Sequence, residues 1–401
     1  MSKTRSIKPY LAEALKAFPV VLLTGARQVG KSTLALELFD NYITFDDGEM
    51  RLFAKENPKD FLRTIHPPVC LDEIQKVPSL LESIKMQVDR TRRNGDFLLT
   101  GSSNVLDFQD ARETLAGRMA LLELYPLSSK ERHDKPFENV IEQILSGDLL
   151  SAAPVSHETL SREILDGGYP EILKLEGFAK ELWFSSYVAT YIERDARDLA
   201  DIRDLDSFIR FVHILASRSA TLLNKSSLAQ ETGVKNETIQ HYLSIMTRIY
   251  QATLLRPYSA NIGKRFVKSP KLFLNDTGVL CHLLKIHSPK ALEESPYSGQ
   301  IYESYLFNEL RKHLAYSRTR GEIYHYRTTD KKEIDFIIET GEKLLAIEVK
   351  RSSSVRMDDF KHIVDFQKRV SRDVLGILFY TGERPLQLAP SLVALPMGVF
   401  L

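Results

Sequence analysis

Short apolar runs alternate with helical patterns through the first 130 residues. Four runs have the length of buried strands, at 20–23, 43–45, 69–71 and 97–100. Apolar residues recur at helical spacing before and between them, in segments 8–17, 32–39 and 79–92. Strands that alternate with helices predict a parallel sheet covered on both faces. The first part of the chain is therefore predicted to have an α/β fold.

The pattern changes after residue 128. Segment 130–220 is mostly helical, and 226–246 predicts two short helices around a tight turn, followed by a β-hairpin at 250–275. From about residue 300 a helix precedes four predicted strands, at 323–327, 333–339, 344–349 and 374–380. These elements indicate a second α/β unit at the end of the chain.

Composition and charge narrow the class of protein only slightly. The chain has 401 residues, 43% apolar and 27% charged, which is ordinary for two or three globular domains. The net charge of +1 neither favours nor excludes nucleic acid, so any basic surface must be local. The two cysteines, Cys70 and Cys281, match no metal-ligand pattern and fit a reducing cytoplasm. We see no signal peptide and no run of the ~20 apolar residues that a membrane span needs. We expect a cytoplasmic protein without membrane contact.

The loop after the first apolar run matches the pattern G-x-x-x-x-G-K-S/T, between a predicted strand and a predicted helix. Glycines let backbone N–H groups turn inward around a phosphate, and the helix N-terminus adds its dipole. Lys31 is expected to neutralise the β- and γ-oxygens of ATP, and the Ser32 hydroxyl to ligate Mg²⁺. The predicted nucleotide-binding residues are Gly25, Ala26, Arg27, Gln28, Val29, Gly30, Lys31, Ser32 and Thr33.

An acidic pair follows the third apolar run, where a phosphate loop needs a partner. The strand would deliver Asp72 to the Mg²⁺ shell and place Glu73 to polarise the attacking water. A helix start capped by acids would give the same pair, because the chain from Ile74 onward has a sequence that a helix accepts. The position of the pair after the phosphate loop favours ATP hydrolysis.

Two further positions complete this predicted site. The fourth run ends in polar residues, of which Ser102 is favoured to hold the attacking water, with Ser103 or Asn104 as alternatives. Arg118 is expected to end the next helix and to reach the γ-phosphate of a neighbouring subunit as an arginine finger. A surface arginine at a helix C-terminus is the alternative. A finger that acts between subunits implies a homo-oligomer.

With these motifs in this order, the chain resembles an AAA+ ATPase. More narrowly, it resembles prokaryotic ATPases that join an AAA domain to a C-terminal domain of unknown function, whose physiological role is poorly defined. One departure from that pattern is Asn275, where an apolar or aromatic residue is expected. The motifs that carry the narrower resemblance are 99–104, 115–118, Gly167-Gly168-Tyr169-Pro170, Arg194-Asp195, 271–278, Glu333-Ile334-Asp335-Phe336 and Ile347-Glu348-Val349-Lys350.

The middle of the chain has helix-turn-helix spacing at 226–243. Gly233 permits the turn, Ile239 and Leu243 are predicted to pack inward, and a helix from Asn236 would expose polar residues to duplex DNA. The following hairpin has a basic character typical of a phosphate-contacting wing. A winged helix used only for packing is the alternative. The residues predicted to contact DNA are Lys235, Thr238, Gln240 and His241 on the helix, and Lys264, Arg265, Lys268 and Lys271 on the wing.

The last strands place two carboxylates and a lysine on one predicted hairpin. Asp335 and Glu348 would share a metal ion, Mg²⁺ or Mn²⁺, and Lys350 would offset charge on a scissile phosphate. This resembles the PD-(D/E)xK nuclease core, in which Glu303 matches the helical acid and Gln367 an accessory polar residue. A charged hairpin edge without a metal is the alternative reading.

We therefore predict an α/β protein of four parts: an AAA+ P-loop parallel-sheet ATPase domain (1–130), a helical lid (131–220), a winged helix-turn-helix (221–285) and a restriction-endonuclease-like domain (286–401). The predicted function is Mg²⁺-dependent ATP hydrolysis coupled to DNA binding, and extending to metal-dependent cleavage. The alternatives are a nucleotide-regulated switch that binds a protein partner and a transcription regulator that does not cut.

Overall fold

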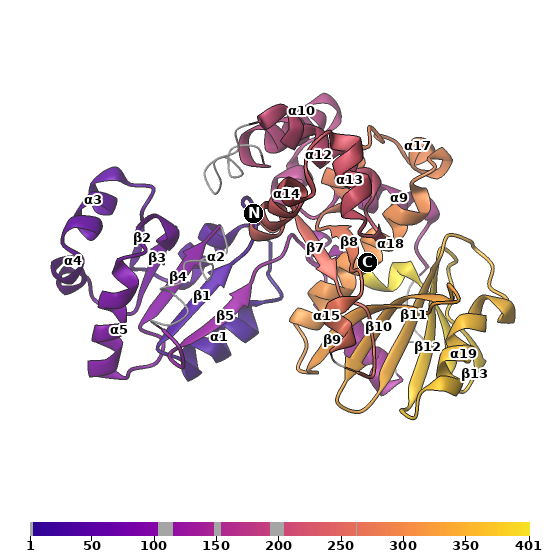
Figure 1. Cartoon of the computed structure of the whole chain (residues 1–401). Coiled ribbons are helices and arrows are strands. Elements are labelled where there is room, and N and C mark those ends of the chain that lie inside the picture. The colour runs from indigo at the N-terminus through magenta and orange to yellow at the C-terminus, as the bar shows by residue number, and fades with distance from the viewer. Residues whose placement is uncertain (1–2, 103–114, 148–153, 193–203, 262) are drawn as a thin grey trace. The chain divides into compact units, whose positions relative to one another are not determined.

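The computed structural model describes residues 3–102, 115–147, 154–192, 204–261 and 263–401 (Figure 1). The chain divides into two compact units, residues 1–127 with 248–250 and residues 128–247 with 251–401. We take each unit by itself.

The first unit is built on a five-stranded parallel sheet in the order β2-β3-β4-β1-β5. Because all strands run the same way, their carboxyl ends meet at one edge of the sheet. The strands are β1 (Val20–Thr24), β2 (Tyr42–Thr44), β3 (Val69–Asp72), β4 (Phe97–Gly101) and β5 (Met119–Glu123). The helices are α1 (Lys8–Ala17), α2 (Lys31–Leu38), α3 (Gly48–Glu56), α4 (Pro58–Thr64) and α5 (Leu80–Thr91), with a 3-10 turn η1 (Ile74–Lys76).

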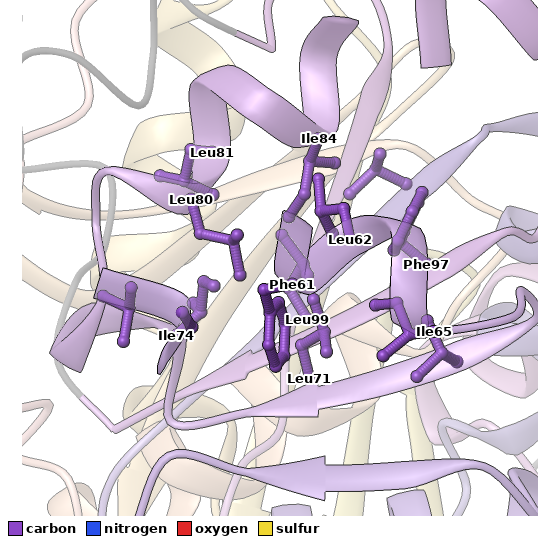
Figure 2. Close-up of a cluster of buried hydrophobic side chains, with 14 of the residues drawn as sticks. Phe61, Leu62, Ile65, Leu71, Ile74, Leu80, Leu81, Ile84, Phe97 and Leu99 are labelled. Atoms are coloured by element: carbon purple, nitrogen blue, oxygen red, sulfur yellow. The ribbon is translucent and has the colours of Figure 1, made fainter. Parts of the chain in front are cut away.

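Side chains that alternate along the central strands form cores on both faces of this sheet. Leu71, Phe97 and Leu99 point to one face, where they pack against Phe61 of α4 and Ile84 of α5 (Figure 2). Their neighbours in sequence are equally buried and point to the other face. Strands that are apolar on both faces are typical of a parallel sheet between two helical layers.

The second unit contains two sheets. A small sheet has the order β6-β8-β7 and a larger mixed sheet has the order β13-β14-β12-β11-β10-β9. The strands are β6 (Thr221–Leu222), β7 (Ala252–Leu255), β8 (Lys271–Leu274), β9 (Gly321–Arg327), β10 (Glu333–Thr340), β11 (Leu344–Lys350), β12 (Val374–Tyr380), β13 (Leu386–Ala389) and β14 (Leu392–Pro396).

Helices make up most of the remainder of this unit. They are α7 (Ser129–Arg132), α8 (Val140–Ser146), α9 (His157–Asp166), α10 (Gly177–Tyr187), α12 (Leu205–Ser217), α13 (Lys225–Thr232), α14 (Asn236–Arg248), α15 (Lys264–Val267), α16 (Thr277–Leu283), α17 (Pro289–Glu294), α18 (Ser298–Ala315) and α19 (Lys361–Arg369). Short 3-10 segments are η4 (Pro170–Lys174), η6 (Met357–Phe360) and η7 (Met397–Phe400), and η5 (Val188–Ile192) is a π-helical turn.

Two sequence motifs of the second unit fold against each other. Asp276 caps α16 by accepting a hydrogen bond from Val279 N at 2.9 Å, and it also accepts one from Gly168 N at 2.7 Å. A side chain at Gly167 would meet the Asp276 carboxylate at 2.4 Å, and Gly167 has a φ of +66°. A bare backbone is therefore required where the 167–170 break meets the 271–278 segment.

The structure departs from the predicted elements at several places. Strand β5 follows a turn at 115–118, and neither it nor the β13–β14 pair was predicted. The predicted hairpin at 250–275 is an antiparallel pair, β7 with β8, whose long connection contains α15. Among the described residues, no helix combines the length and apolar character that crossing a membrane requires.

Candidate functional site

The phosphate loop follows β1 at the carboxyl edge of the parallel sheet. Gly25 has a φ of +140°, and a Cβ there would lie 2.2 Å from the Leu124 carbonyl oxygen. Gly30, with a φ of +96°, precedes the first residue of α2. The Lys31 ammonium is buried and donates to the carbonyls of Gly25 at 2.9 Å and Ala26 at 2.7 Å. The loop thus curls around the lysine, as the sequence pattern requires.

Arg5 contacts this loop from a segment before α1, a role that no motif in the sequence indicates. Its guanidinium donates to the Val29 carbonyl and to the Tyr125 carbonyl, both at 2.6 Å. The side chain is buried. Arg5 therefore ties the loop to the segment after β5.

Asp72 lies at the end of β3 as the centre of a group of hydroxyl donors. Ser32 Oγ donates to it at 3.1 Å, Tyr42 OH at 2.7 Å and Thr44 Oγ1 at 3.2 Å, and Thr100 Oγ1 also donates. Burial, and then the hydrogen bond to Asp72, raise the pKa of Tyr42 above its ordinary value, so the phenol stays a neutral donor. Ser32 and Asp72, the two predicted Mg²⁺ ligands, are in contact.

Glu73 lies beside Asp72 but turns to a different group of side chains. Its backbone is left-handed, with φ +59°, and its N–H donates to Thr100 Oγ1 at 3.2 Å. Glu73 Oε2 accepts from Gln75 Nε2 and, at 3.3 Å, from Ser102 Oγ. Gln75 also donates to Ser102 at 3.1 Å. Ser102 and Glu73 are therefore together, as predicted, and Gln75 joins them. The alternatives Ser103 and Asn104 lie outside the described residues.

Arg118 lies at the end of the parallel sheet opposite to the phosphate loop. Val20 of β1 pairs with Met119 of β5, so Arg118 precedes the amino ends of these strands, whereas the phosphate loop follows the carboxyl end of β1. One five-residue strand, roughly 16 Å, separates the two ends. Arg118 Nε pairs with Asp89 Oδ1 at 2.5 Å. Arg118 lies in the turn 115–118, and residues 103–114, which precede this turn, lie outside the described residues.

The second unit contains the predicted carboxylates on adjacent elements. Phe336 of β10 pairs with Ile347 of β11, which brings Asp335 beside Glu348. Asp335 Oδ2 accepts a hydrogen bond from Val349 N at 2.8 Å. Burial, and then the Asp335 charge, raise the pKa of Glu348 well above its ordinary value. Glu303 on α18 has its pKa raised by the same two causes.

Lys271 of β8 occupies the middle of these acids. Its ammonium lies 2.5 Å from Glu303 Oε1, 3.1 Å from Glu333 Oε1 and 3.6 Å from Asp335 Oδ1. Burial alone would lower the pKa of Lys271, but the carboxylates of Glu303, Asp335 and Glu333 outweigh it and raise the pKa. A charge buried this deeply persists only when it is paired. The predicted wing contact of Lys271 with phosphate is therefore wrong.

Comparison with known proteins gives three matches along the chain. Residues 17–133 match a family model described as an AAA domain, residues 157–290 a domain of unknown function (DUF8612), and residues 298–400 a domain of unknown function (DUF4143). An uncharacterized protein of Mycobacterium tuberculosis is 30% identical over 398 residues, covering 96% of this chain and 82% of that one. The chain belongs to the family of AAA-domain ATPases that end in a DUF4143 domain. The resemblance stated from the sequence is confirmed to that extent.

Two further matches to this AAA–DUF4143 protein are weaker. An uncharacterized protein of Haemophilus influenzae is 24% identical and covers 88% of each chain. The crystal structure of protein VC1899 from Vibrio cholerae is 11% identical over 92% of this chain and 90% of that chain, with a TM-score of 0.17, which carries no argument about the fold.

Two of the residues predicted for the nuclease-like site point elsewhere. Lys350 forms an ion pair with Asp359 of η6. Gln367 of α19 donates to the Val374 carbonyl at 3.0 Å. Val374 pairs with Leu344, four residues before Glu348 on β11, so Gln367 lies at the other end of these strands. Its predicted accessory role at the carboxylates is wrong, because its amide satisfies a strand end.

The residues of the predicted helix-turn-helix lie on α13, on α14 and in the turn between them. Gly233 has a φ of +75° between α13 and α14, and Ile239 and Leu243 are buried. Lys235, Gln240 and His241 are exposed, and Thr238 is half-buried. The motif residues Arg194 and Asp195 lie outside the described residues.

The predicted basic wing is only half accessible. Lys264 and Lys268 are exposed. Arg265 is buried, donates to Tyr324 OH and pairs with Glu339, both at 2.7 Å. The prediction that Arg265 contacts phosphate is wrong for the reason given for Lys271, since a buried cation takes a carboxylate of its own chain. Asn275, the departure from the family pattern, accepts from Thr253 and Arg311.

Within the described part of the chain, no group of three or more His, Cys, Asp or Glu side chains is arranged to hold a metal ion. The two predicted sites differ in how well they would accept one. Ser32 and Asp72 present oxygens that converge beside the phosphate loop, and Mg²⁺ is bound through one or two such groups together with substrate phosphates. Asp335 and Glu348 do not fit a divalent ion as they stand, because the Lys271 ammonium is already among their oxygens.

Proposed function

We propose that the first unit binds MgATP and hydrolyses its γ-phosphate. The observation that carries this proposal is the contact of Ser32 with Asp72, next to the loop that surrounds Lys31. Strands β1 and β3 and the N-terminus of α2 bring these groups to one edge of the sheet. An open α/β sheet binds its ligand at that edge.

In this proposal each side chain has a separate task. The Lys31 ammonium moves from the loop carbonyls to the β- and γ-phosphate oxygens, and the N–H groups of residues 25–33 donate to the phosphates. Ser32 and Asp72 would hold Mg²⁺, which supplies charge neutralisation at the phosphate oxygens. Tyr42, Thr44 and Thr100 fix the orientation of Asp72 through their hydroxyl groups.

Glu73 is proposed to accept the proton of the attacking water. Gln75 and Ser102 position its carboxylate through the two hydrogen bonds to Oε2. The water oxygen forms a bond to the γ-phosphorus while the bond from that phosphorus to the β-phosphate bridging oxygen breaks, and the products are ADP and phosphate. A left-handed backbone at a non-glycine residue costs of order 1–3 kcal/mol and persists where the surrounding contacts require it.

The test is phosphate release and nucleotide binding by the full chain. Lys31→Ala is expected to abolish both, because the loop loses its positive charge. Full nucleotide affinity in that variant would remove the basis of the proposal. Lys16→Ala, on the last turn of α1 and outside the loop, is the matched control and should leave both measurements unchanged.

We further propose that Arg118 acts on a neighbouring subunit. It precedes the amino end of β5, one strand length from the phosphate loop of its own chain, and this distance favours action on the nucleotide of another chain. A finger of this kind would make turnover depend on a homo-oligomer.

A second candidate function is duplex DNA binding by α14. The observation that favours it is the exposure of Lys235, Gln240 and His241 after the turn at Gly233. The element order α12-β6-α13-α14-β7-β8 supports the interpretation of this segment as a winged helix. Metal-dependent cleavage is not part of this proposal, because Lys271 stands among the carboxylates that would carry it.

Fluorescence anisotropy with a labelled duplex at two salt concentrations tests the DNA proposal. Affinity is expected to fall with salt and to fall in Lys235→Ala, whereas Lys290→Ala on α17 serves as an exposed-lysine control. No duplex affinity at low salt would leave a protein-binding switch as the role of this module.

A further inference from the structure

Four carboxylates of the second unit gather around one ammonium group. Glu303 comes from α18, Glu333 and Asp335 from β10, and Glu348 from β11. Lys271 enters from β8, and its side chain is 4% exposed. The cluster therefore joins three segments that are far apart in the sequence through a single buried cation.

The position of the Lys271 ammonium decides what else the cluster can hold. Its distances of 2.5 to 3.6 Å to oxygens of three carboxylates are those of direct ion pairs. A divalent ion makes its bonds to the same kind of oxygen at about 2.0–2.6 Å, so it would need the volume that the ammonium fills. Two cations at such a separation repel each other strongly in a buried place.

Other groups of the chain also contact carboxylates of this cluster. Asp335 Oδ2 accepts a hydrogen bond from Val349 N at 2.8 Å. Glu333 Oε2 lies 3.4 Å from the Arg327 guanidinium. Basic side chains and a backbone N–H of the chain itself therefore contact three of the four carboxyl groups, those of Glu303, Glu333 and Asp335.

We infer that Lys271 is the resident cation of this carboxylate cluster and closes it to divalent metal ions. The cluster then acts as a joint and not as a hydrolytic centre. It connects β8, the middle strand of the small sheet, to α18 and to β10 in the large sheet. The inference is independent of nucleotide hydrolysis in the first unit.

Several contacts beside the cluster make the same connection. Asn308 of α18 donates to the Leu274 carbonyl at 3.0 Å, and Ser304 lies 2.9 Å from Ser219, oxygen to oxygen. Arg265, from the connection between β7 and β8, is held by Glu339 of β10. We use the word seam for these contacts together with the ion pairs of Lys271. The seam joins β8 and the segments next to it to α18 and β10.

Manganese binding to the nucleotide-free full chain, followed by electron paramagnetic resonance, tests the inference. The parent and Glu348→Gln should bind Mn²⁺ alike, because the cluster takes no metal while Lys271 is present. Lys271→Met should gain at least about tenfold tighter Mn²⁺ binding, since a unit positive charge has left the centre of the cluster. The gain should vanish when Lys271→Met is combined with Glu348→Gln. Lys268→Met, an exposed lysine of the same segment, should behave like the parent.

Two results would overturn the inference. One is Mn²⁺ binding by the parent that Glu348→Gln removes, which would mean that metal enters past the lysine. The other is a folded Lys271→Met protein, by circular dichroism, with no gain in Mn²⁺ binding. If Lys271→Met does not fold, the comparison of the parent with Glu348→Gln decides alone.

Discussion

Replacing Glu73 by glutamine isolates the proton-accepting charge of the proposed ATPase site. The amide has almost the shape of the carboxylate, and its oxygen still accepts from Gln75 and Ser102 as Glu73 Oε2 does. Neither the phosphate loop nor Asp72 loses a partner. We therefore expect nucleotide affinity within about twofold of the parent and a kcat lower by about 10²–10⁴, the usual contribution of general base catalysis.

The contacts of Glu73 also predict which of two further variants, Gln75→Ala or Ser102→Ala, loses more of its catalytic rate. Gln75→Ala removes a donor that contacts both Glu73 and Ser102, whereas Ser102→Ala removes the longer contact of 3.3 Å. A hydrogen bond to a charged group contributes about 1.5–3 kcal/mol, which corresponds to a tenfold to hundredfold loss for Gln75→Ala. The loss in Ser102→Ala should be smaller.

Single-turnover phosphate release, with nucleotide affinity measured separately, distinguishes these effects. Glu82→Gln, an exposed acid on α5, is the matched control and should turn over normally. The reasoning would be wrong if Glu73→Gln kept the parental kcat. It would also be wrong if the Gln75 and Ser102 variants lost nucleotide affinity instead of rate, since that would make them binding residues.

Three further predictions concern the finger, a cap and a buried histidine. Arg118→Ala should lower kcat by about 10³-fold without changing nucleotide affinity. Asp89→Ala, which releases Arg118 from its ion pair, should not lower kcat. Equal turnover in the parent and in Arg118→Ala would exclude an arginine finger. Asp276→Ala should lower the free energy of unfolding by about 3 kcal/mol, because two buried N–H donors lose their acceptor; fluorescence of the single tryptophan, Trp183, in urea measures this, and a loss under 1 kcal/mol would contradict it. Burial lowers the pKa of His313 to about 3, so below its ordinary value of 6.5 the unfolded chain binds a proton that the folded chain does not. Stability should therefore fall from pH 6.5 toward pH 3 by up to ~1.4 kcal/mol per pH unit. His313→Asn, which keeps an acceptor for Val140 N, should lack this part of the slope, and identical slopes would refute the assignment.

Much of the nucleotide site could be predicted from the sequence because its main parts are local. The phosphate loop is a contiguous segment, and its glycines have the left-handed or unusual φ values that the pattern implies. Asp72 follows a run of apolar residues, which identified it as a strand end. Such signals need no knowledge of the sheet order.

The partners of Asp72 and Glu73 could not be found in this way. Tyr42, Thr44 and Thr100 meet at one carboxylate only because β3 lies between β2 and β4. Strand order is set by packing over the whole unit, and a single sequence does not display it. Gln75 lies two residues from Glu73, but only the left-handed turn at Glu73 brings its amide back to the carboxylate.

Whether each basic residue is buried or exposed was the hardest property to predict from the sequence. Lys271 and Lys268 belong to one segment, yet one is buried and the other exposed. One signal existed: Lys271 begins a strand whose next three residues, Leu272, Phe273 and Leu274, are all buried. A lysine in such a strand requires an acidic partner. Its partners are Glu303, Glu333 and Asp335, of which Asp335 was predicted to be a metal ligand.

The seam through Lys271 has a mechanical consequence. Ion pairs and hydrogen bonds join the small sheet to α18 and to β10, so a pull applied at α14 would load the large sheet as well. In an optical-trap experiment, residues 205–401 should unfold in a single step. In Lys271→Met, unfolding should divide into two steps at lower force. Force applied to a ligand bound at α14 would thus be transmitted to the C-terminal strands, which would resist it together with the small sheet.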